Sequence, residues 1–126
     1  MANHTWRYTN GDDLPDLREW CAAHGSMDPV PVLPQVGVLV DDCLAVFLYQ
    51  TDSSLCLIDS IVSRPGTPPF IVKDALLFGI AQLKAVAKDM GYTRVLGLAD
   101  RASIASLCAT LGGTPRAHIT VFDGSL

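Results

Sequence analysis

The residues best suited to chemistry gather around one apolar segment, residues 55–62, and the loop that follows it. Asp59 is the only carboxylate in that segment, and a buried carboxylate holds its proton more strongly, which suits acid–base chemistry. The loop, residues 63–69, contains Arg64 and Gly66 and leads into a long helical pattern. Unpaired N–H groups at the start of a helix favour an anion. These residues are the candidate site, and the surrounding elements must position them.

The expected elements follow from apolar periodicity and from turn residues. Residues 55–62, 70–90 and 93–99 predict a strand–helix–strand unit, whose strands form a parallel pair with a right-handed crossover. Short turns make residues 35–62 an antiparallel meander. Asp13 is expected to cap the first helix. The other expected strands are residues 5–9, 35–40, 44–50 and 117–122. A further helix is expected at 14–24, and a short one, capped by Asp100 or Ser103, is expected to end near 111. Residues 28–34 are expected to form a proline-rich loop.

These elements predict one α/β (α+β) domain over residues 1–126, in the order β-α-β-β-β-α-β-α-β. We expect a central mixed, mostly antiparallel sheet of about six to seven strands, with three helices. Only 17% of the residues are charged and the net charge is −4. A nucleic-acid surface needs clustered Lys and Arg, and a membrane span needs ~20 apolar residues. Neither a nucleic acid nor a membrane is therefore an expected partner.

The four cysteines lie within apolar segments and lack the spacing of metal ligands. We therefore expect no metal site, and small buried side chains in place of disulfides. The first residues contain no apolar segment of the signal-peptide type, so reduced thiols and a cytoplasmic location are expected. The cysteines are Cys21, Cys43, Cys56 and Cys108.

The order of elements resembles that of the GNAT N-acetyltransferase superfamily, over nearly the whole chain. One local match is the sequence Ile-Val-Ser-Arg-Pro at residues 61–65, which leads into the long helix as the fourth strand does in that family. The other is residues 106–113, Ser-Leu-Cys-Ala-Thr-Leu-Gly-Gly, which are similar to the family's "LYEKLGF" ending of its last helix. Short proteins of this appearance also occur among bacteriophage genes, which would place this chain in the host cytoplasm or in a virion.

The resemblance implies a site for acetyl-CoA where the fourth and fifth strands splay apart. A bulged fourth strand would bind the pantetheine arm, and the next loop would give N–H groups to the pyrophosphate. The resemblance also implies a general base at Asp59, and it places Cys108 where the family has a Tyr that acts as general acid. A carboxylate bound to a backbone amide and an apolar core thiol are the respective alternatives. The implied cofactor-binding residues are Ile61, Ser63, Arg64, Gly66 and Thr67.

The loop departs from the family pattern Q/R-x-x-G-x-G/A. Pro65, Pro68 and Pro69 have no N–H group, so three hydrogen-bond donors are missing. Two functions therefore stay open. One is an acyl-CoA-dependent N-acetyltransferase with a degenerate cofactor loop. The other is a non-catalytic scaffold that acts in assembly or regulation, such as a phage virion or accessory component.

The long helix at 70–90 also predicts a partner surface. One side of it is expected to face the sheet through Val72, Leu76, Gly79, Leu83, Val86, Ala87 and Met90. The opposite side carries a second apolar stripe, which suggests contact with another copy of the chain or another protein subunit. The alternative is that the first helix or the 28–34 loop covers this stripe. The stripe consists of Leu77, Phe78, Ala81 and Ala85.

Overall fold

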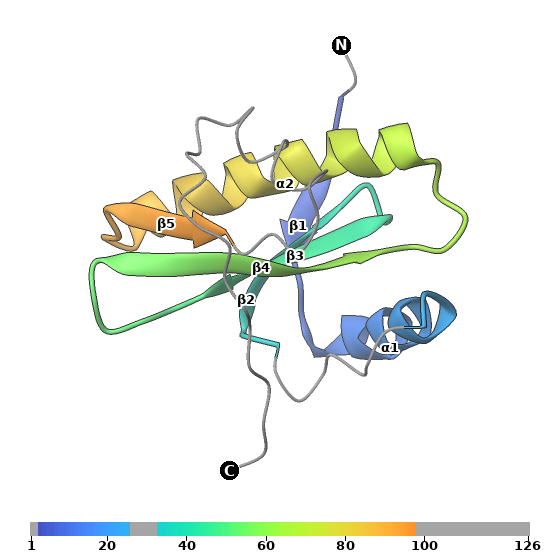
Figure 1. The fold of residues 1–126 in the computed structure, drawn as a ribbon, viewed down its shortest axis with the longest axis horizontal. Helices are drawn as coiled ribbons and strands as arrows, with labels where there is room; N and C mark the ends of the chain where they lie inside the picture. Colours follow the sequence, from blue (N-terminus) through green and yellow to red (C-terminus); the bar gives the residue numbers. More distant parts are fainter. Residues whose placement is uncertain (1–2, 26–32, 98–126) are drawn as a thin grey trace.

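The computed structural model describes residues 3–25 and 33–97. Within them, five strands form one sheet in the order β1-β2-β3-β4-β5, with a helix on either face (Figure 1). The strands are β1 (Trp6–Tyr8), β2 (Val36–Val40), β3 (Leu44–Tyr49), β4 (Leu55–Ser63) and β5 (Arg94–Gly97), and the helices are the 3₁₀ helix η1 (Gly11–Asp13), α1 (Leu14–Ala23) and α2 (Pro69–Asp89).

The sheet is mixed, as the sequence predicts. The pairs β1–β2, β2–β3 and β3–β4 are antiparallel, and β4–β5 is parallel. The β2–β3 turn has two central residues, Asp41 and Asp42, with φ of +50° and +51°. The N–H of Cys43 closes it by donating to the carbonyl of Val40 at 2.9 Å. Positive φ at both central residues is typical of the type I′ hairpin turn, whose backbone twist matches that of the flanking strands.

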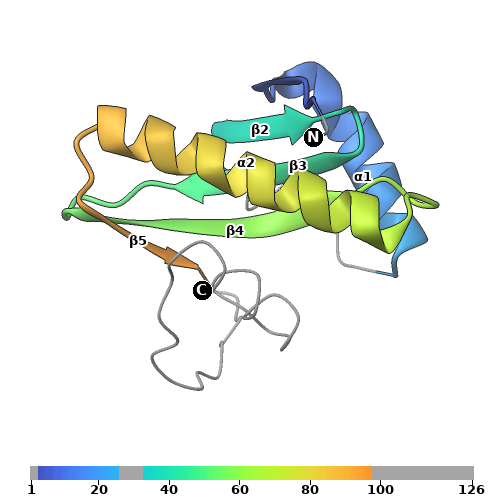
Figure 2. The same cartoon turned by 90° about the horizontal axis from the view of Figure 1, so that it is seen from above.

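Two separate apolar cores lie on the two faces of the sheet. The core between the sheet and α2 contains Val38, Val46 and Leu83, all fully buried. The core on the α1 face contains Leu17, Trp20 and Phe47. Figure 2 shows α2 running along the sheet from the loop after β4 to β5. β4 is therefore packed against a helix on each face of the sheet.

The predicted elements are confirmed over the described residues, with bounds that differ by at most two residues except at 93–99, where the description ends at residue 97. The structure describes five of the expected six to seven strands and two of the three expected α-helices. The short helix near 111, the strand at 117–122, the match at 106–113 and Cys108 lie outside the described residues, as does most of the 28–34 loop.

The predicted role of Asp13 is wrong. Its side chain makes no capping bond to α1. Instead Asp13 accepts two hydrogen bonds from the guanidinium of Arg7, at 2.6 and 2.9 Å, and one from the N–H of Asn10 at 2.9 Å. Asn10 supplies the cap, because its side chain accepts from the N–H of Asp12 at 2.8 Å. The inserted 3₁₀ turn moves the cap back by three residues.

The predicted faces of α2 need a partial correction. The predicted sheet-facing side is confirmed for Leu76, Gly79, Leu83 and Ala87, which are buried, but Met90 is exposed. Leu77 and Phe78 are partly buried against the core, so only Ala81 and Ala85 of the predicted outward stripe are exposed. The ring of His4 also lies 4.7 Å from that of Phe78, so the chain's own start contacts the stripe.

Cys21, Cys43 and Cys56 are buried, as expected. Burial raises the pKa of the Cys43 and Cys56 thiols, which keeps them protonated. Among residues 3–25 and 33–97, no helix is long and apolar enough to cross a membrane. The same residues contain no group of three His, Cys, Asp or Glu side chains arranged to hold a metal ion.

Candidate functional site

A bulge in β4 is the main irregularity of the sheet. Ala45 pairs with Val62 and Phe47 pairs with Asp59, so two steps along β3 correspond to three steps along β4. The extra residue lies at Ser60, which has a φ of +59°. A non-glycine residue in this region is uncommon and costs roughly 1–2 kcal/mol. The bulge breaks the regular ladder and releases backbone groups of β4 from pairing.

Within the described residues, the bulge directly follows the parallel pairs between β4 and β5. Leu55 to Ile58 of β4 pair with Arg94 to Gly97 of β5. Asp59 and Ser60 follow immediately, and the second half of β4 pairs with β3 alone within the described part of the chain. Within residues 3–25 and 33–97, the backbone of β4 therefore has no strand partner on its β5 side beyond Ile58.

Side chains of β4 project to both faces around the bulge. Asp59 is half-buried and lies on the α1 face, because it is registered with Phe47 of the α1-side core. Ile61 packs against the core on the α2 face. The hydroxyl groups of Tyr49 and Ser60 hydrogen-bond to each other across β3 and β4. The bulged backbone is thus anchored by a side chain of the neighbouring strand.

The loop between β4 and α2 offers few N–H groups. That of Arg64 donates to the carbonyl of Cys43 at 2.8 Å, and that of Thr67 donates to the carbonyl of Arg64 at 3.3 Å. The three prolines at 65, 68 and 69 have none. Among the residues that the structure describes, Gly66 and Phe70 retain N–H groups without a hydrogen-bond partner. The anion-binding capacity of this loop is small.

Trp20 of α1 and His24, the residue directly after α1, contact the start of the same loop. His24 Nε2 lies 3.0 Å from the carbonyl oxygen and 3.3 Å from the hydroxyl oxygen of Ser63. The guanidinium of Arg64 lies 5.2 Å from the centre of the Trp20 ring, a cation–π arrangement. Arg64 is therefore directed toward α1 and not along the first turn of α2.

The predicted site residues form one continuous segment that runs from the bulge into the loop. Asp59, Ile61 and Ser63 lie on β4, and Arg64, Gly66 and Thr67 lie in the loop, while Cys108 lies outside the described residues. The predicted site residues do not include Ser60 or three residues that contact the segment: Tyr49, Trp20 and His24. The bulge had one sequence signal, because apolar residues at 56, 58 and 61 break the alternation of a strand.

The whole-chain comparisons locate this fold among known proteins. No family model matches the sequence, and no curated protein does. Solved structures do match. An acetyltransferase of Trypanosoma brucei aligns with a TM-score of 0.65 at 15% identity, covering 98% of this chain and 100% of the other. An aminoglycoside antibiotic 6′-N-acetyltransferase of Acinetobacter baumannii aligns with a TM-score of 0.65 at 14% identity, covering 98% and 99%.

A third match bears on the cofactor. Rv2747 of Mycobacterium tuberculosis, solved in complex with CoA, aligns with a TM-score of 0.67 at 18% identity, covering 94% of this chain and 76% of that one. Identities this low establish the fold alone. A mixed sheet with a bulged fourth strand, a parallel β4–β5 pair and these neighbours agree with one another: the chain has the fold of the GNAT N-acetyltransferase superfamily.

Proposed function

We propose that this chain is an acyl-CoA-dependent N-acetyltransferase with a degenerate cofactor loop. The observation that carries the proposal is the bulge at Ser60, which directly follows the described pairs between β4 and β5. A bulge here re-aims backbone groups toward an edge of β4 that has no partner among the described residues, and an extended ligand can pair with them there. The bound CoA of the structural neighbour Rv2747 is consistent with this cofactor class.

The residues present fit the two ends of acetyl-CoA unequally. The backbone at 59–60 is suited to the amide groups of the pantetheine arm, since these pair with a strand edge as another strand would. The pyrophosphate would find the N–H groups of Gly66 and Phe70, and Arg64 only if its guanidinium leaves Trp20. We therefore expect weak binding that depends mainly on the strand.

Acetyl-CoA supplies the thioester: an amine nitrogen bonds to its carbonyl carbon, the carbon–sulfur bond breaks, and CoA leaves as a thiolate that takes up a proton. Asp59 is the proposed base. It is half-buried beside the bulge, where its carboxylate can take the proton that the attacking amine loses, directly or through one water. The N–H groups of the bulged strand would polarise the carbonyl oxygen.

Calorimetric titration with acetyl-CoA tests the proposal. Deleting Ser60 restores the alternation of apolar residues and places Ile61 opposite Val46, which faces the same core, so the deletion variant should fold. Because one or two backbone hydrogen bonds would be lost, we expect its affinity to fall about tenfold or more. The matched control is Tyr49→Phe, which removes the hydroxyl contact but keeps the bulge. Equal affinity of the deletion variant and the wild type would contradict the proposal.

A non-catalytic scaffold is the second candidate, and the β4–α2 loop favours it. Internal contacts occupy this loop, which an enzyme would keep open for its cofactor. They are the contact of Arg64 with Trp20 and that of His24 with Ser63. Such a protein would act in assembly or regulation, for example as a phage virion or accessory component. Absence of binding at millimolar acetyl-CoA would support this candidate, and native mass measurement would then look for a homo-oligomer or another bound subunit.

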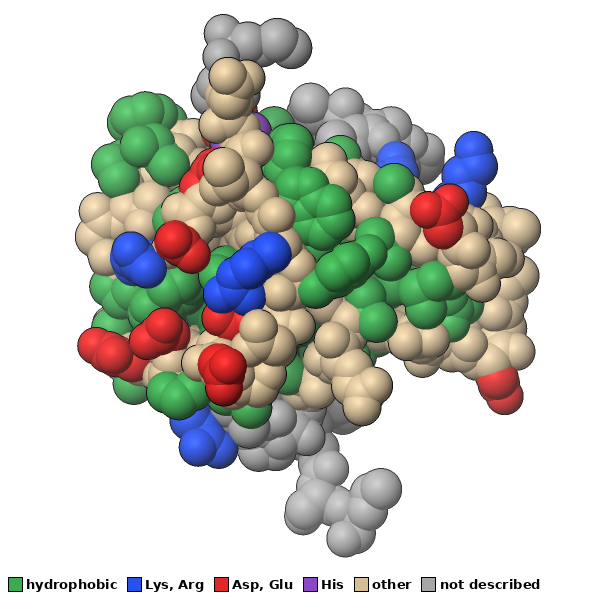
Figure 3. Space-filling model, turned by 180° about the vertical axis from the view of Figure 1, so that it is seen from behind, with side chains coloured by type: hydrophobic (Ala, Val, Ile, Leu, Met, Phe, Trp, Pro, Cys, Tyr) green, Lys and Arg blue, Asp and Glu red, His purple; other side chains and the backbone are tan. Residues whose placement is uncertain are grey.

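A scaffold would bind its partner through its exposed apolar surface. Hydrophobic side chains gather across the middle of the face seen in Figure 3, with charged side chains around them. Ala81 and Ala85 on α2, Trp6 and Tyr8 on β1, and Phe70 at the start of α2 are exposed apolar residues of the described chain. A substitution such as Ala81→Glu should dissociate an oligomer built on α2 and leave a monomer unchanged.

A further inference from the structure

Two hydroxyl groups from neighbouring strands meet at the bulge of β4. Tyr49 is the last residue of β3 and Ser60 is the bulged residue of β4, and their hydroxyl groups hydrogen-bond to each other. Both residues are half-buried. Tyr49 packs against the core on the α1 face, and Asp59 lies on that same face. The hydroxyl pair is therefore a neighbour of the proposed base.

The pair has one hydrogen more than its internal contact uses. Each hydroxyl group donates one hydrogen bond, and the bond between Tyr49 and Ser60 uses one of the two hydrogens, whichever group donates. Among residues 3–25 and 33–97, neither hydroxyl group has a second hydrogen-bond partner. The remaining hydrogen can therefore bond to water or to a ligand at the bulge.

Ser60 is the member of the pair that an extended ligand on β4 would approach. Its short side chain stands on the backbone that is proposed to pair with the pantetheine arm, and paired strands lie only about 4.8 Å apart. Tyr49 lies on β3, on the other side of β4 from β5. A phenol is a stronger donor than an alcohol, which favours donation from Tyr49 to Ser60. The hydrogen that remains is then the one on Ser60.

We propose that this hydroxyl pair binds the sulfur atom of CoA, with Ser60 donating a hydrogen bond to the sulfur and Tyr49 donating to Ser60. The inference rests on the proposed function, for it names the residues that the leaving group would meet. Ser60 is then a catalytic residue, and Tyr49 is a positioning residue that acts through it. This gives β3 and β4 a role that the family resemblance assigns to Cys108, which lies outside the described residues.

The pair acts when the carbon–sulfur bond breaks and its electron pair stays on the sulfur. The hydrogen bond from Ser60 then becomes charge-assisted and therefore stronger. The Ser60 proton passes to the sulfur, the Tyr49 proton passes to Ser60, and water returns a proton to Tyr49. The neutral sulfur of the thioester is a weak acceptor, so the interaction is stronger in the transition state than in the bound substrate.

The test compares the affinities of the full chain for CoA and for acetyl-CoA, by calorimetry at pH 6.5 and pH 9. A thiol loses its proton near pH 8.5, roughly, whereas an acetylated sulfur cannot ionise. Acetyl-CoA therefore controls for every other effect of pH on the protein. The measured quantity is the ratio of CoA affinity to acetyl-CoA affinity. Between the two pH values, we expect this ratio to rise about fivefold more in the wild type than in Ser60→Gly.

The variants separate the hydroxyl groups from the bulge itself. Ser60→Gly removes the hydroxyl group, and glycine adopts the positive φ of this position without strain, so the variant should fold and keep the bulge. Tyr49→Phe leaves Ser60 without its donor, and its rise should lie between those of the wild type and Ser60→Gly. The matched control is Ser54→Gly, at an exposed position directly before β4, which should behave as the wild type does.

The outcomes separate this inference from the proposed function. A rise in the affinity ratio that Ser60→Gly loses and Ser54→Gly keeps supports the sulfur site. Equal ratios in the wild type and Ser60→Gly at both pH values overturn the sulfur site, while the binding of acetyl-CoA leaves the proposed function standing. If neither CoA nor acetyl-CoA binds the wild type at millimolar concentration, the proposed function fails, and the sulfur site fails with it.

Discussion

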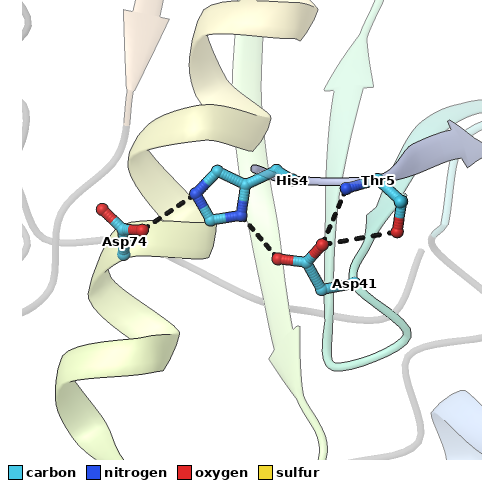
Figure 4. Close-up of polar contacts among 4 residues, drawn as sticks. All are labelled: His4, Thr5, Asp41 and Asp74. Carbon is cyan, nitrogen blue, oxygen red and sulfur yellow. Dashed lines mark hydrogen bonds and ion pairs between the residues drawn. The ribbon is translucent and has the colours of Figure 1, made fainter. Parts of the chain in front are cut away.

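His4 Nε2 lies 2.8 Å from Oδ2 of Asp74, which joins the start of the chain to α2 (Figure 4). The other ring nitrogen of His4 lies 2.5 Å from Asp41, and Asp41 also accepts from the N–H of Thr5 at 2.8 Å. A neutral imidazole has one N–H, so it donates to only one of the two carboxylates. Both contacts are hydrogen bonds only when His4 is protonated.

This geometry predicts a pH-dependent stability. The hydrogen bond to Asp41 raises the pKa of His4 above 6.5; burial opposes the shift, and the charges of Asp41 and Asp74 add to it. The stabilisation is therefore complete below pH 6.5 and is lost as the pH rises through the raised pKa. Burial opposes a low pKa for Asp41, but the hydrogen bonds from His4 and Thr5 outweigh it and lower that pKa. The stabilisation that the Asp41 carboxylate provides is therefore lost only when the pH falls below 3.8.

Thermal unfolding between pH 5 and 9 checks this prediction. The melting temperature of the wild type should decrease with rising pH more steeply than that of His4→Gln. Asp74→Asn keeps a hydrogen-bond acceptor but removes one charge. The slope of its melting temperature against pH should therefore lie between those of the wild type and His4→Gln. Parallel curves for wild type and His4→Gln would show that folding does not raise the pKa of His4.

The β2–β3 turn predicts unequal effects of substitution at two adjacent aspartates. Both Asp41 and Asp42 have positive φ, which glycine adopts without strain. Asp42 is exposed, so Asp42→Gly should change the free energy of unfolding by less than about 1 kcal/mol. Asp41→Gly removes the acceptor of His4 and Thr5 and should destabilise by about 1–3 kcal/mol. Urea denaturation of the two variants measures the difference, and equal stabilities would contradict the role of the Asp41 carboxylate.

Arg7 and Asp13 predict a second sensitive contact. Asp13 is 7% exposed and both its oxygens are bonded to the guanidinium of Arg7. The hydrogen bond from Arg7 lowers the pKa of Asp13, against the effect of burial, so its stabilisation is lost as the pH falls below 3.8. Asp13→Asn should cost about 1–3 kcal/mol, whereas Asp12→Asn, at an exposed neighbour, should be nearly neutral. Equal stability of the two variants would show that the contact between Arg7 and Asp13 does not stabilise the fold.

The sequence predicts the fold well where the signals are local. Apolar runs bounded by proline, glycine and short turns gave β2, β3, β4 and α2 nearly to the residue, since period and punctuation act within a few positions. Prediction from the sequence failed where a side chain has more than one possible hydrogen-bond partner. Asp13 has the right type and position for a cap, yet Arg7 on β1 pairs with it more strongly.

The candidate site shows the same division. The segment from Asp59 to Thr67 was predicted, because strand, loop and helix follow one another along the chain. The contacts that hold it were not, since Trp20 and His24 reach it from α1, about 40 residues earlier in the sequence. The Ser60 bulge is an intermediate case. It changes the pairing between strands, but its sequence signal, the break in the alternation of apolar residues, is local.

The last prediction concerns catalysis by Asp59. If Asp59 removes the proton of the attacking amine, Asp59→Asn should lower kcat for CoA release by about 10²–10⁴-fold while acetyl-CoA affinity stays within a factor of about two. Asp52→Asn, at an exposed turn before β4, is the control that keeps the same charge change away from the site. If Asp59→Asn retained full kcat, proton transfer would have to pass to water or to the amine's own solvent shell, and Asp59 would be a structural residue of the bulge.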